Sequence, residues 1–366
     1  MSHLSHLRTQ LKDHKLNGFL VTKAENVRYL TGFSGSFGMV LVQKSGPHYL
    51  ITDSRYQARA EEICDQYPGR EKLQFQLFDK EFGDTFGAKI KGNYATEKTV
   101  TLRQFDRIKQ KWFKKAKWTS LDNLVEDLRT TKTKEEIEYT TQAATHTSEV
   151  LEKFLQSLFR KPDISESEAA FMLENMLRDG GNYELAFPAI VAFGENSSVP
   201  HHSPSHRTLI RNENILVDCG AKYQGYCADI TRNFWFGAKV DPEYRERHEN
   251  LLSIQRKALK KFVTGTKTAD LHQAVLDNLN ADAQYFTHSL GHGTGLEIHE
   301  APSISSRSEE ALAQNQIVTC EPGVYYPKKF GIRIEDQIVV KKRFAQSSIL
   351  STFEKELIVL MPPEGK

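Results

Sequence analysis

Four acidic residues of the chain occupy matching places in two predicted β-hairpins. In the first hairpin, Asp218 ends the apolar segment 215–220 and Asp229 lies within residues 227–232. A turn centred on Tyr223-Gln224 would place the two carboxylates directly opposite each other, with Cβ atoms about 4.5–5.5 Å apart. Two like charges at that separation destabilise a hairpin, so we expect either a cation between them or a proton on one of them.

The second hairpin repeats this arrangement. Glu321 follows the apolar segment 317–320, and Glu335 lies within residues 331–336. A turn centred on Lys328 would place Glu321 opposite Glu335. Burying an unpaired carboxylate is very costly, so acids in such apolar strands are paired, protonated or bound to a metal.

For any one of these acids, a strand end that reaches solvent is the simpler explanation. Two facing pairs in matching hairpins favour a site that holds cations. Arg232 and Arg333 lie close to these acids in the sequence and could neutralise two of the four charges. A cluster of salt bridges therefore remains an alternative to metal.

A segment rich in histidine and glycine, residues 288–295, lies between the two hairpins. His288 and His292 have the spacing of a zinc-binding helix, but the glycines at 291, 293 and 295 would break a helix there. We therefore expect a short strand or loop that approaches a site closely. Three further histidines flank these segments: His201, His202 and His299. Taken alone, each histidine is more often a surface or core residue than a ligand.

Helices must pack on these hairpins to hold them in place. Thr133 with Glu136, and Ser165 with Glu168, form capping boxes that predict helix starts, and Gly180-Gly181 predicts the end of the second helix. The remaining predicted elements are strands at 186–193, 215–221 and 226–236, helices at 243–262 and 268–279, and strands at 316–325 and 332–341. Two helices followed by a hairpin, occurring twice, predict an internally duplicated α+β domain.

Residues 1–125 have a different pattern, in which short strands such as 18–21 and 39–42 alternate with helices such as 56–66. This alternation predicts a smaller α/β domain. We place the boundary near residues 128–132, which gives domains of 1–127 and 128–366.

One basic stretch, residues 109–117, could suggest a nucleic-acid patch. Phe105, Ile108 and Trp112 fall at helical spacing, so we interpret its lysines as the solvated face of an amphipathic helix.

The composition agrees with an ordinary globular protein of 366 residues. The net charge of +2 is too balanced to indicate a nucleic-acid or membrane partner. Residues 1–20 lack the apolar stretch of a signal peptide, and no window reaches the ~18 apolar residues of a membrane span. Four cysteines in so long a chain do not indicate a disulfide framework. We therefore expect a cytoplasmic protein with reduced thiols.

Five segments together resemble one enzyme family. They are Val217-Asp218-Cys219-Gly220, Tyr226-Cys227-Ala228-Asp229-Ile230-Thr231-Arg232, Gly291-His292-Gly293-Thr294-Gly295, Glu321-Pro322-Gly323 and Arg333-Ile334-Glu335-Asp336. In order and spacing they resemble the metallopeptidases with the pita-bread fold, and within them the proline-directed aminopeptidase P and Xaa-Pro dipeptidases. Residues 26–33 resemble the N-terminal domain of the same family, so the resemblance covers nearly the whole chain.

The resemblance implies a set of metal ligands: Asp218, Asp229, His292, Glu321 and Glu335. By the same analogy Asp229 and Glu335 bridge two divalent ions, and Glu321 orients a bridging water and takes its proton, which leaves the hydroxide that attacks. Oxygen ligands with one nitrogen suit Mn²⁺ first, with Co²⁺, Zn²⁺ or Fe²⁺ as alternatives.

The resemblance also implies roles for four residues around the metals. His201 and His299 would stabilise the oxyanion and shuttle protons, and His288 would lie beside the proline of the substrate. Arg333 would position the substrate or tune Glu335. Cys219 and Cys320 should point to the opposite strand face and lie in the core, whereas Cys227 could approach the site.

These features imply an aminopeptidase that releases the residue in front of proline, acting as a homodimer. An Xaa-Pro dipeptidase is the alternative, and it would need a group that recognises the free carboxylate of the dipeptide. A non-catalytic binding module on the same fold is a remote alternative, because all five ligand positions are filled.

Overall fold

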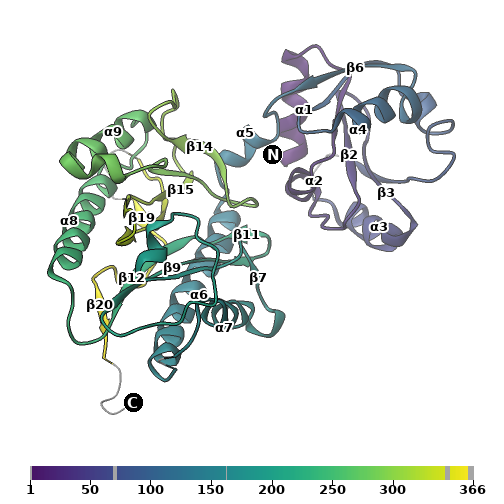
Figure 1. Cartoon of the computed structure of the whole chain (residues 1–366). Coiled ribbons are helices and arrows are strands. Elements are labelled where there is room, and N and C mark those ends of the chain that lie inside the picture. The colour runs from purple at the N-terminus through teal and green to yellow at the C-terminus, as the bar shows by residue number, and fades with distance from the viewer. Residues whose placement is uncertain (1, 69–71, 162, 343–346, 362–366) are drawn as a thin grey trace. The chain divides into compact units, whose positions relative to one another are not determined.

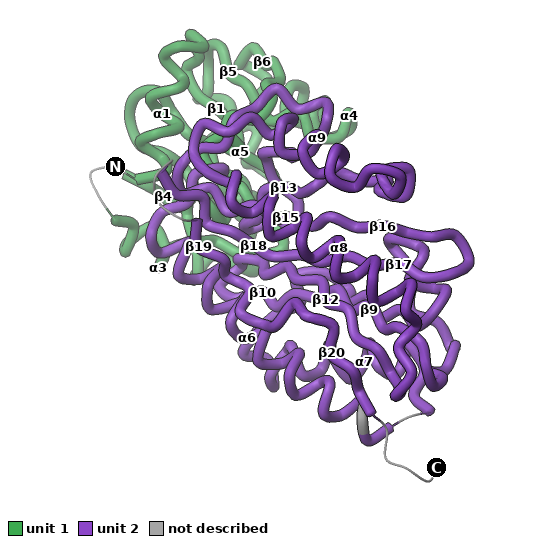
Figure 2. Tube along the Cα trace, turned by 90° about the vertical axis from the view of Figure 1, so that its left-hand side faces the viewer, with its two compact units in different colours: residues 1–129 green, residues 130–366 purple. Residues whose placement is uncertain are grey.

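The computed structural model describes residues 2–68, 72–161, 163–342 and 347–361. The chain forms two compact units, residues 1–129 and 130–366, coloured separately in Figure 2. Among the described residues, no helix has the length and apolar character needed to span a membrane.

The first unit is built on a six-stranded sheet with the order β4-β3-β2-β1-β5-β6. Its strands are β1 (Gly18–Val21), β2 (Met39–Gln43), β3 (His48–Thr52), β4 (Leu73–Leu77), β5 (Gly92–Glu97) and β6 (Ala116–Leu121). Its helices are α1 (His3–Asp13), α2 (Ala24–Thr31), α3 (Gln57–Gln66), α4 (Leu102–Arg107) and α5 (Glu126–Thr130) (Figure 1). Alternate residues face two separate cores, since Phe19 and Val21 lie in one cluster and Leu20 in the other.

The basic stretch is only partly helical. The helix continues past α4 as a π-helical segment from Ile108 to Trp112, so Phe105, Ile108 and Trp112 pack together as predicted. Beyond it the prediction is wrong, because β6 begins at Ala116 and pairs in parallel with β5. Burial of Trp118 in this edge strand outweighs the helical preference of the lysines.

In its described residues the second unit contains two pairs of α-helices and four sheets. The helices are α6 (Lys134–Phe159), α7 (Glu166–Arg178), α8 (Pro242–Leu259) and α9 (Thr268–Leu279). The first group of strands is β7 (Glu184–Leu185), β8 (Ile190–Phe193), β9 (Glu213–Cys219), β10 (Ala221–Tyr223), β11 (Tyr226–Cys227) and β12 (Ile230–Phe236). The second group is β13 (Gly291–Gly293), β14 (Glu300–Ile304), β15 (Ile317–Cys320), β16 (Gly323–Tyr326), β17 (Phe330–Arg333), β18 (Asp336–Val339), β19 (Ser348–Ile349) and β20 (Ile358–Leu360).

Each helix pair packs on its own sheet, which confirms the predicted duplication. One core joins α6 and α7 to the sheet β20-β12-β9-β8, and the other joins α8 and α9 to the sheet β14-β13-β15-β18-β19. Both predicted capping boxes are present, at Thr133 and Ser165. Cys219 lies in the first of these cores and Cys320 in the second, as expected.

Each strand predicted for this unit is divided into two shorter ones, as in the pairs β9 and β10, β11 and β12, β15 and β16, and β17 and β18, and the first predicted strand loses most. Residues 186–193 do not form a continuous strand, because β7 ends at Leu185 and β8 begins at Ile190. Pro188 lies between them and has no N–H to donate to a ladder.

The register of the first hairpin differs from the prediction. Asp218 pairs with Thr231 and not with Asp229, because the turn lies on Gln224-Gly225, both with positive φ. The predicted direct pairing of the two acids is therefore wrong by two residues. A shift of two keeps every side chain on its own face, so Asp218 and Asp229 still share one face of the hairpin.

The register of the second hairpin is confirmed. Cys320 pairs with Asp336 in one sheet and Gly323 pairs with Arg333 in the next, with Lys328 at the turn, where φ is 59°. This register sets Glu321 opposite Glu335. Both acids lie where the strands are interrupted, between β15 and β16 and between β17 and β18.

Candidate active site

The nine residues singled out from the sequence all line one cavity of about 510 Å³ in the second unit. They are His201, Asp218, Asp229, His288, His292, His299, Glu321, Arg333 and Glu335. Both hairpins and the strand β13 between them contribute, so each half of the duplicated domain supplies part of the wall.

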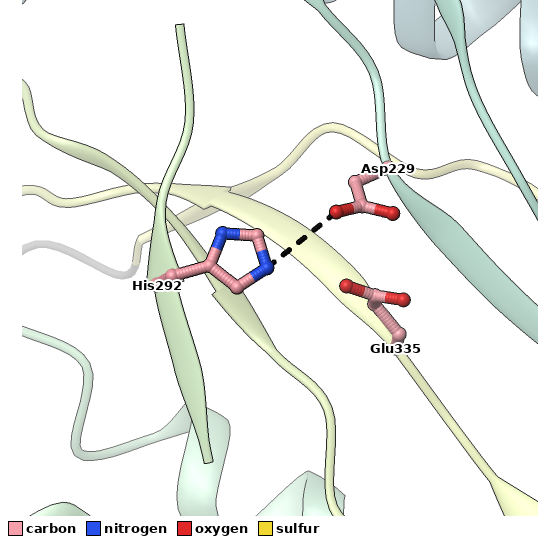
Figure 3. A group of neighbouring side chains, drawn as sticks. All are labelled: Asp229, His292 and Glu335. Atoms are coloured by element: carbon pink, nitrogen blue, oxygen red, sulfur yellow. Dashed lines mark ion pairs between the residues drawn. The ribbon is translucent and has the colours of Figure 1, made fainter. Parts of the chain in front are cut away.

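Asp229, His292 and Glu335 form the tightest group (Figure 3). Each offers one ligand atom, and these atoms all lie within 4.8 Å of one another. His292 Nε2 is 3.6 Å from Asp229 Oδ2 and 3.3 Å from Glu321 Oε1. His292 Nδ1 lies 3.1 Å from the carbonyl oxygen of Gly293, which can only accept, so Nδ1 carries a proton and Nε2 faces the carboxylates. This is the orientation of a histidine that binds a metal through Nε2.

Asp218 lies next to this group and is held by Arg333. Its Oδ2 accepts a hydrogen bond of 2.6 Å from Arg333 Nη2, whereas its buried Oδ1 has no hydrogen-bond partner among the described residues. A buried carboxylate oxygen without a donor is a costly feature. It fits a ligand position for a cation, which would supply the missing partner.

The cluster carries more negative charge than its cationic neighbours can neutralise. Burial raises the pKa of Asp229 and Glu335 well above the ordinary values, and the neighbouring acids raise both further. Burial also raises the pKa of Asp218 in spite of the Arg333 guanidinium. Burial opposes ionisation of Glu321 as well, but the hydrogen bond and charge of His292 outweigh it and lower the pKa of Glu321 to about 2. Divalent cations would remove this electrostatic conflict.

The salt-bridge alternative holds for only one of the two arginines. Arg232 donates to Asp336, and to the backbone carbonyl of Glu335, but to none of the four carboxylates in the cluster. Arg333 pairs with a single acid, Asp218. One guanidinium therefore faces four carboxylates, which leaves the metal interpretation as the better fit.

The other histidines surround the cluster. His288 Nδ1 lies 2.8 Å from the carbonyl of Ser289, and burial lowers the pKa of its imidazole. The ring of His299 is 4.3 Å from that of His292, and burial, followed by the charge of His292, lowers the pKa of His299. His201 is exposed, on the segment that follows β8. Because the pKa values of His288 and His299 are both lowered, these two imidazoles are neutral near pH 7.

Two residues of the site were missed from the sequence. Thr231 Oγ1 donates to Glu335 Oε2 at 2.6 Å and accepts from Arg333 Nε at 3.0 Å. Tyr325 Oη accepts from Arg333 Nη1 at 2.7 Å and lies 2.9 Å from His288 Nε2. The correct register of the first hairpin would have revealed Thr231, because it stands opposite Asp218. Cys227, by contrast, does not line the cavity, and its Sγ lies near the carbonyl of Leu296.

Comparison with known families identifies the fold and its chemistry. Residues 138–342 match the model of Metallopeptidase family M24, and residues 3–131 match that of the Creatinase/Prolidase N-terminal domain. The chain belongs to metallopeptidase family M24. It is therefore a metallopeptidase with a pita-bread catalytic domain that follows a smaller α/β domain along the chain, as the sequence predicted.

Similar M24 proteins match this one over nearly its whole length. An uncharacterized peptidase of Bacillus subtilis is 32% identical, over 98% of this chain and 99% of the relative. The solved Xaa-Pro dipeptidase from Bacillus anthracis is 30% identical, with a TM-score of 0.88 and coverage of 98% and 99%. The crystal structure of the X-Pro aminopeptidase from Thermotoga maritima is 33% identical, with a TM-score of 0.83 and coverage of 94% and 98%.

Proposed function

We propose that this M24 metallopeptidase is a dinuclear-metal aminopeptidase that hydrolyses the bond between an N-terminal residue and a following proline. The observation that carries the proposal is the convergence of three buried carboxylates, the half-buried Glu321 and one imidazole on a single cavity. Residues 128–366 would form the catalytic domain and residues 1–127 the N-terminal domain. A homodimer is expected from the family resemblance, and sedimentation velocity would measure the number of chains in the particle.

Five side chains would hold the two ions: Asp218, Asp229, His292, Glu321 and Glu335. Asp229 and Glu335 would contact both ions. The donor set of carboxylate oxygens and one nitrogen suits Mn²⁺, and also Co²⁺, Zn²⁺ or Fe²⁺. When bound, the ions would lower the pKa of a water molecule and polarise the scissile carbonyl.

The chain's own groups would then orient the substrate and move its protons. As a ligand of a cation Glu321 would be ionised, so its carboxylate could hold the attacking water by a hydrogen bond. The lowered pKa of His299 keeps its imidazole neutral, with one N–H that can donate to the developing oxyanion. His201, exposed at the cavity, could deliver a proton to the leaving proline nitrogen.

The rest of the wall suits a proline ring. Apolar side chains line it, namely Phe187, Pro188, Ala189, Ile190 and Ile298. An Xaa-Pro bond has no N–H, so a site that depended on that donor would reject it. Recognition of the ring by apolar contact, with His288 beside it, needs no such donor.

One feature supports an aminopeptidase over a dipeptidase. In the described wall of the cavity, Arg333 is the single arginine or lysine, and Asp218, Tyr325 and the carbonyl of Pro200 already occupy its guanidinium. The free carboxylate of an Xaa-Pro dipeptide would require a cationic partner, whereas a longer peptide presents a neutral amide there. The two solved relatives above comprise one enzyme of each kind, so similarity supports the class and not the choice.

A peptide panel tests the proposal. We expect the purified protein with added Mn²⁺ to cleave Ala-Pro-Ala, to cleave Ala-Pro at least about tenfold less efficiently, and to leave Ala-Ala-Ala largely intact. Treatment with EDTA should abolish cleavage, and Mn²⁺ should restore it. Faster cleavage of Ala-Pro than of Ala-Pro-Ala would show a dipeptidase, and cleavage indifferent to proline or to EDTA would refute the proposal as a whole.

A further inference from the structure

A buried glutamate behind the cavity wall gathers an unusual number of hydrogen bonds. Glu166 occupies the first turn of α7, and its side chain is 0% exposed. Its carboxylate accepts from the Phe193 N–H at 2.8 Å, Asn196 Nδ2 at 3.0 and 3.1 Å, His202 Nε2 at 2.8 Å, and Ser205 N and Oγ at 3.0 and 2.6 Å. All of these donors come from the single segment 193–205.

This segment forms one side of the cavity. Residues 200–204 line the cavity, whereas Glu166 does not. The segment has other anchors as well. Ser197 Oγ accepts from Asn214 and from the Gly331 N–H, and the Pro200 carbonyl accepts from Arg333 Nη1 at 3.2 Å. The carbonyls of Pro204 and Ser205 accept from Ser167 Oγ at 3.1 and 2.9 Å. The chain between Pro200 and His202 is thus fixed at both ends, by Arg333 on one side and by Glu166 on the other.

His201 is the one residue between these two fixed points. Its side chain is exposed, so its own packing does little to hold it, and its backbone must be placed by its neighbours. The Glu166 carboxylate is ionised, since burial raises its pKa but the hydrogen bonds from Ser205, Phe193, His202 and Asn196 outweigh burial and lower it. A buried charge with all its acceptor sites filled is a rigid anchor, and its removal leaves several donors without partners.

We infer that Glu166 is a positioning residue, which holds the segment 193–205 so that His201 faces the reacting bond. This inference rests on the proposed function, because it assigns Glu166 an effect on turnover through His201. Glu166 touches neither the carboxylate cluster nor the cavity, so its loss should lower kcat while the content of metal stays the same. A displacement of about 1 Å at a catalytic group can cost on the order of 100-fold in rate.

A double-mutant cycle tests this inference with Ala-Pro-Ala and Mn²⁺. Glu166→Gln keeps the volume of the side chain but removes its charge and presents an NH₂ group to the donors. We expect kcat to fall about 10- to 100-fold, KM to change less than about threefold, and bound metal to stay at the wild-type level. In a His201→Ala background, Glu166→Gln should lower kcat less than about twofold, because the group that it positions is already gone.

Glu168→Gln is the matched control. Glu168 lies on the same first turn of α7 and caps it through Ser165, but none of its hydrogen bonds reaches the segment 193–205. This variant should lose some stability and keep kcat. If Glu166→Gln does not fold, Asn196→Ala removes one donor of the same anchor, and it should show a smaller fall in kcat and the same non-additivity with His201→Ala.

The outcomes separate this inference from the proposed function. A wild-type protein that cleaves none of the proline peptides would refute the function itself. A wild-type protein that cleaves them, with the effects of Glu166→Gln and His201→Ala simply multiplying, would refute the positioning role alone. Equal falls in kcat for Glu166→Gln and Glu168→Gln would do the same, because they would trace the effect to helix stability.

Discussion

Replacing Arg333 by methionine should destabilise the metal-free protein far more than the metal-loaded protein. The guanidinium is buried, with its side chain 4% exposed, and among the arginines of the described segments it alone pairs with a carboxylate of the cluster, at 2.6 Å from Asp218. Removing one partner of a buried ion pair costs about 3–5 kcal/mol, because the other charge is left uncompensated. For a unit of this size that corresponds to a fall in Tm of about 6–20 °C.

Bound divalent ions would change this result. Two ions beside Asp218, Asp229 and Glu335 would supply the positive charge that the variant lacks, so we expect less than half of the loss in the Mn²⁺-loaded protein. The assay is thermal unfolding of the wild type and Arg333→Met, each with excess EDTA and with excess Mn²⁺. Saturating metal also raises Tm of the wild type by mass action, so the quantity to compare is the difference between variant and wild type within each condition.

Arg232→Met provides the matched control. Arg232 is equally buried, at 2% exposure, and pairs with Asp336 at 2.7 Å, outside the carboxylate cluster. It should lose similar stability with EDTA and with Mn²⁺. Equal losses for Arg333→Met in the two conditions would mean that no cation compensates Asp218, and the metal centre would have to be placed elsewhere.

Three further predictions concern the proposed metal ligands, His299 and the buried His248. Asp229→Asn and Glu335→Gln should each abolish turnover and reduce bound metal as measured by elemental analysis, because each removes a carboxylate that we propose as a ligand of both ions. A variant with full metal content and activity would contradict that role. His299→Ala should lower kcat about 100- to 1,000-fold with metal content unchanged, because it removes a donor to the oxyanion, and loss of metal would show that the imidazole is a ligand instead. His248 is 1% exposed, and burial lowers its pKa from 6.5 to about 4. Between these two pH values the unfolded chain binds more protons than the folded protein, so the free energy of unfolding should rise with pH. Urea unfolding should show this rise to be about 3 kcal/mol larger in the wild type than in His248→Phe. Parallel pH profiles of the two proteins would refute this assignment.

The sequence by itself was enough to find the four acids and the histidines of the cavity. The register of the second hairpin could be predicted correctly because Glu321 and Glu335 lie equally far along the sequence from Lys328, whose positive φ forms the turn. Helix starts at Thr133 and Ser165 were equally local, since a capping box is satisfied within one turn. Features determined by neighbours along the chain were therefore open to prediction.

Only the tertiary structure decided which groups meet. The first hairpin turns on Gln224-Gly225 because both residues adopt positive φ, and the sequence alone allowed the centre one residue earlier. That shift puts Thr231 opposite Asp218. The next residue, Arg232, lies on the other face of the strand, and its guanidinium meets Asp336, so two arginines of equal charge have different surroundings. Glu166 has no local signal either, because its donors lie 27 to 39 residues further along the chain. Contacts of this kind depend on how α7 packs against the wall of the cavity, and no spacing in the sequence encodes them.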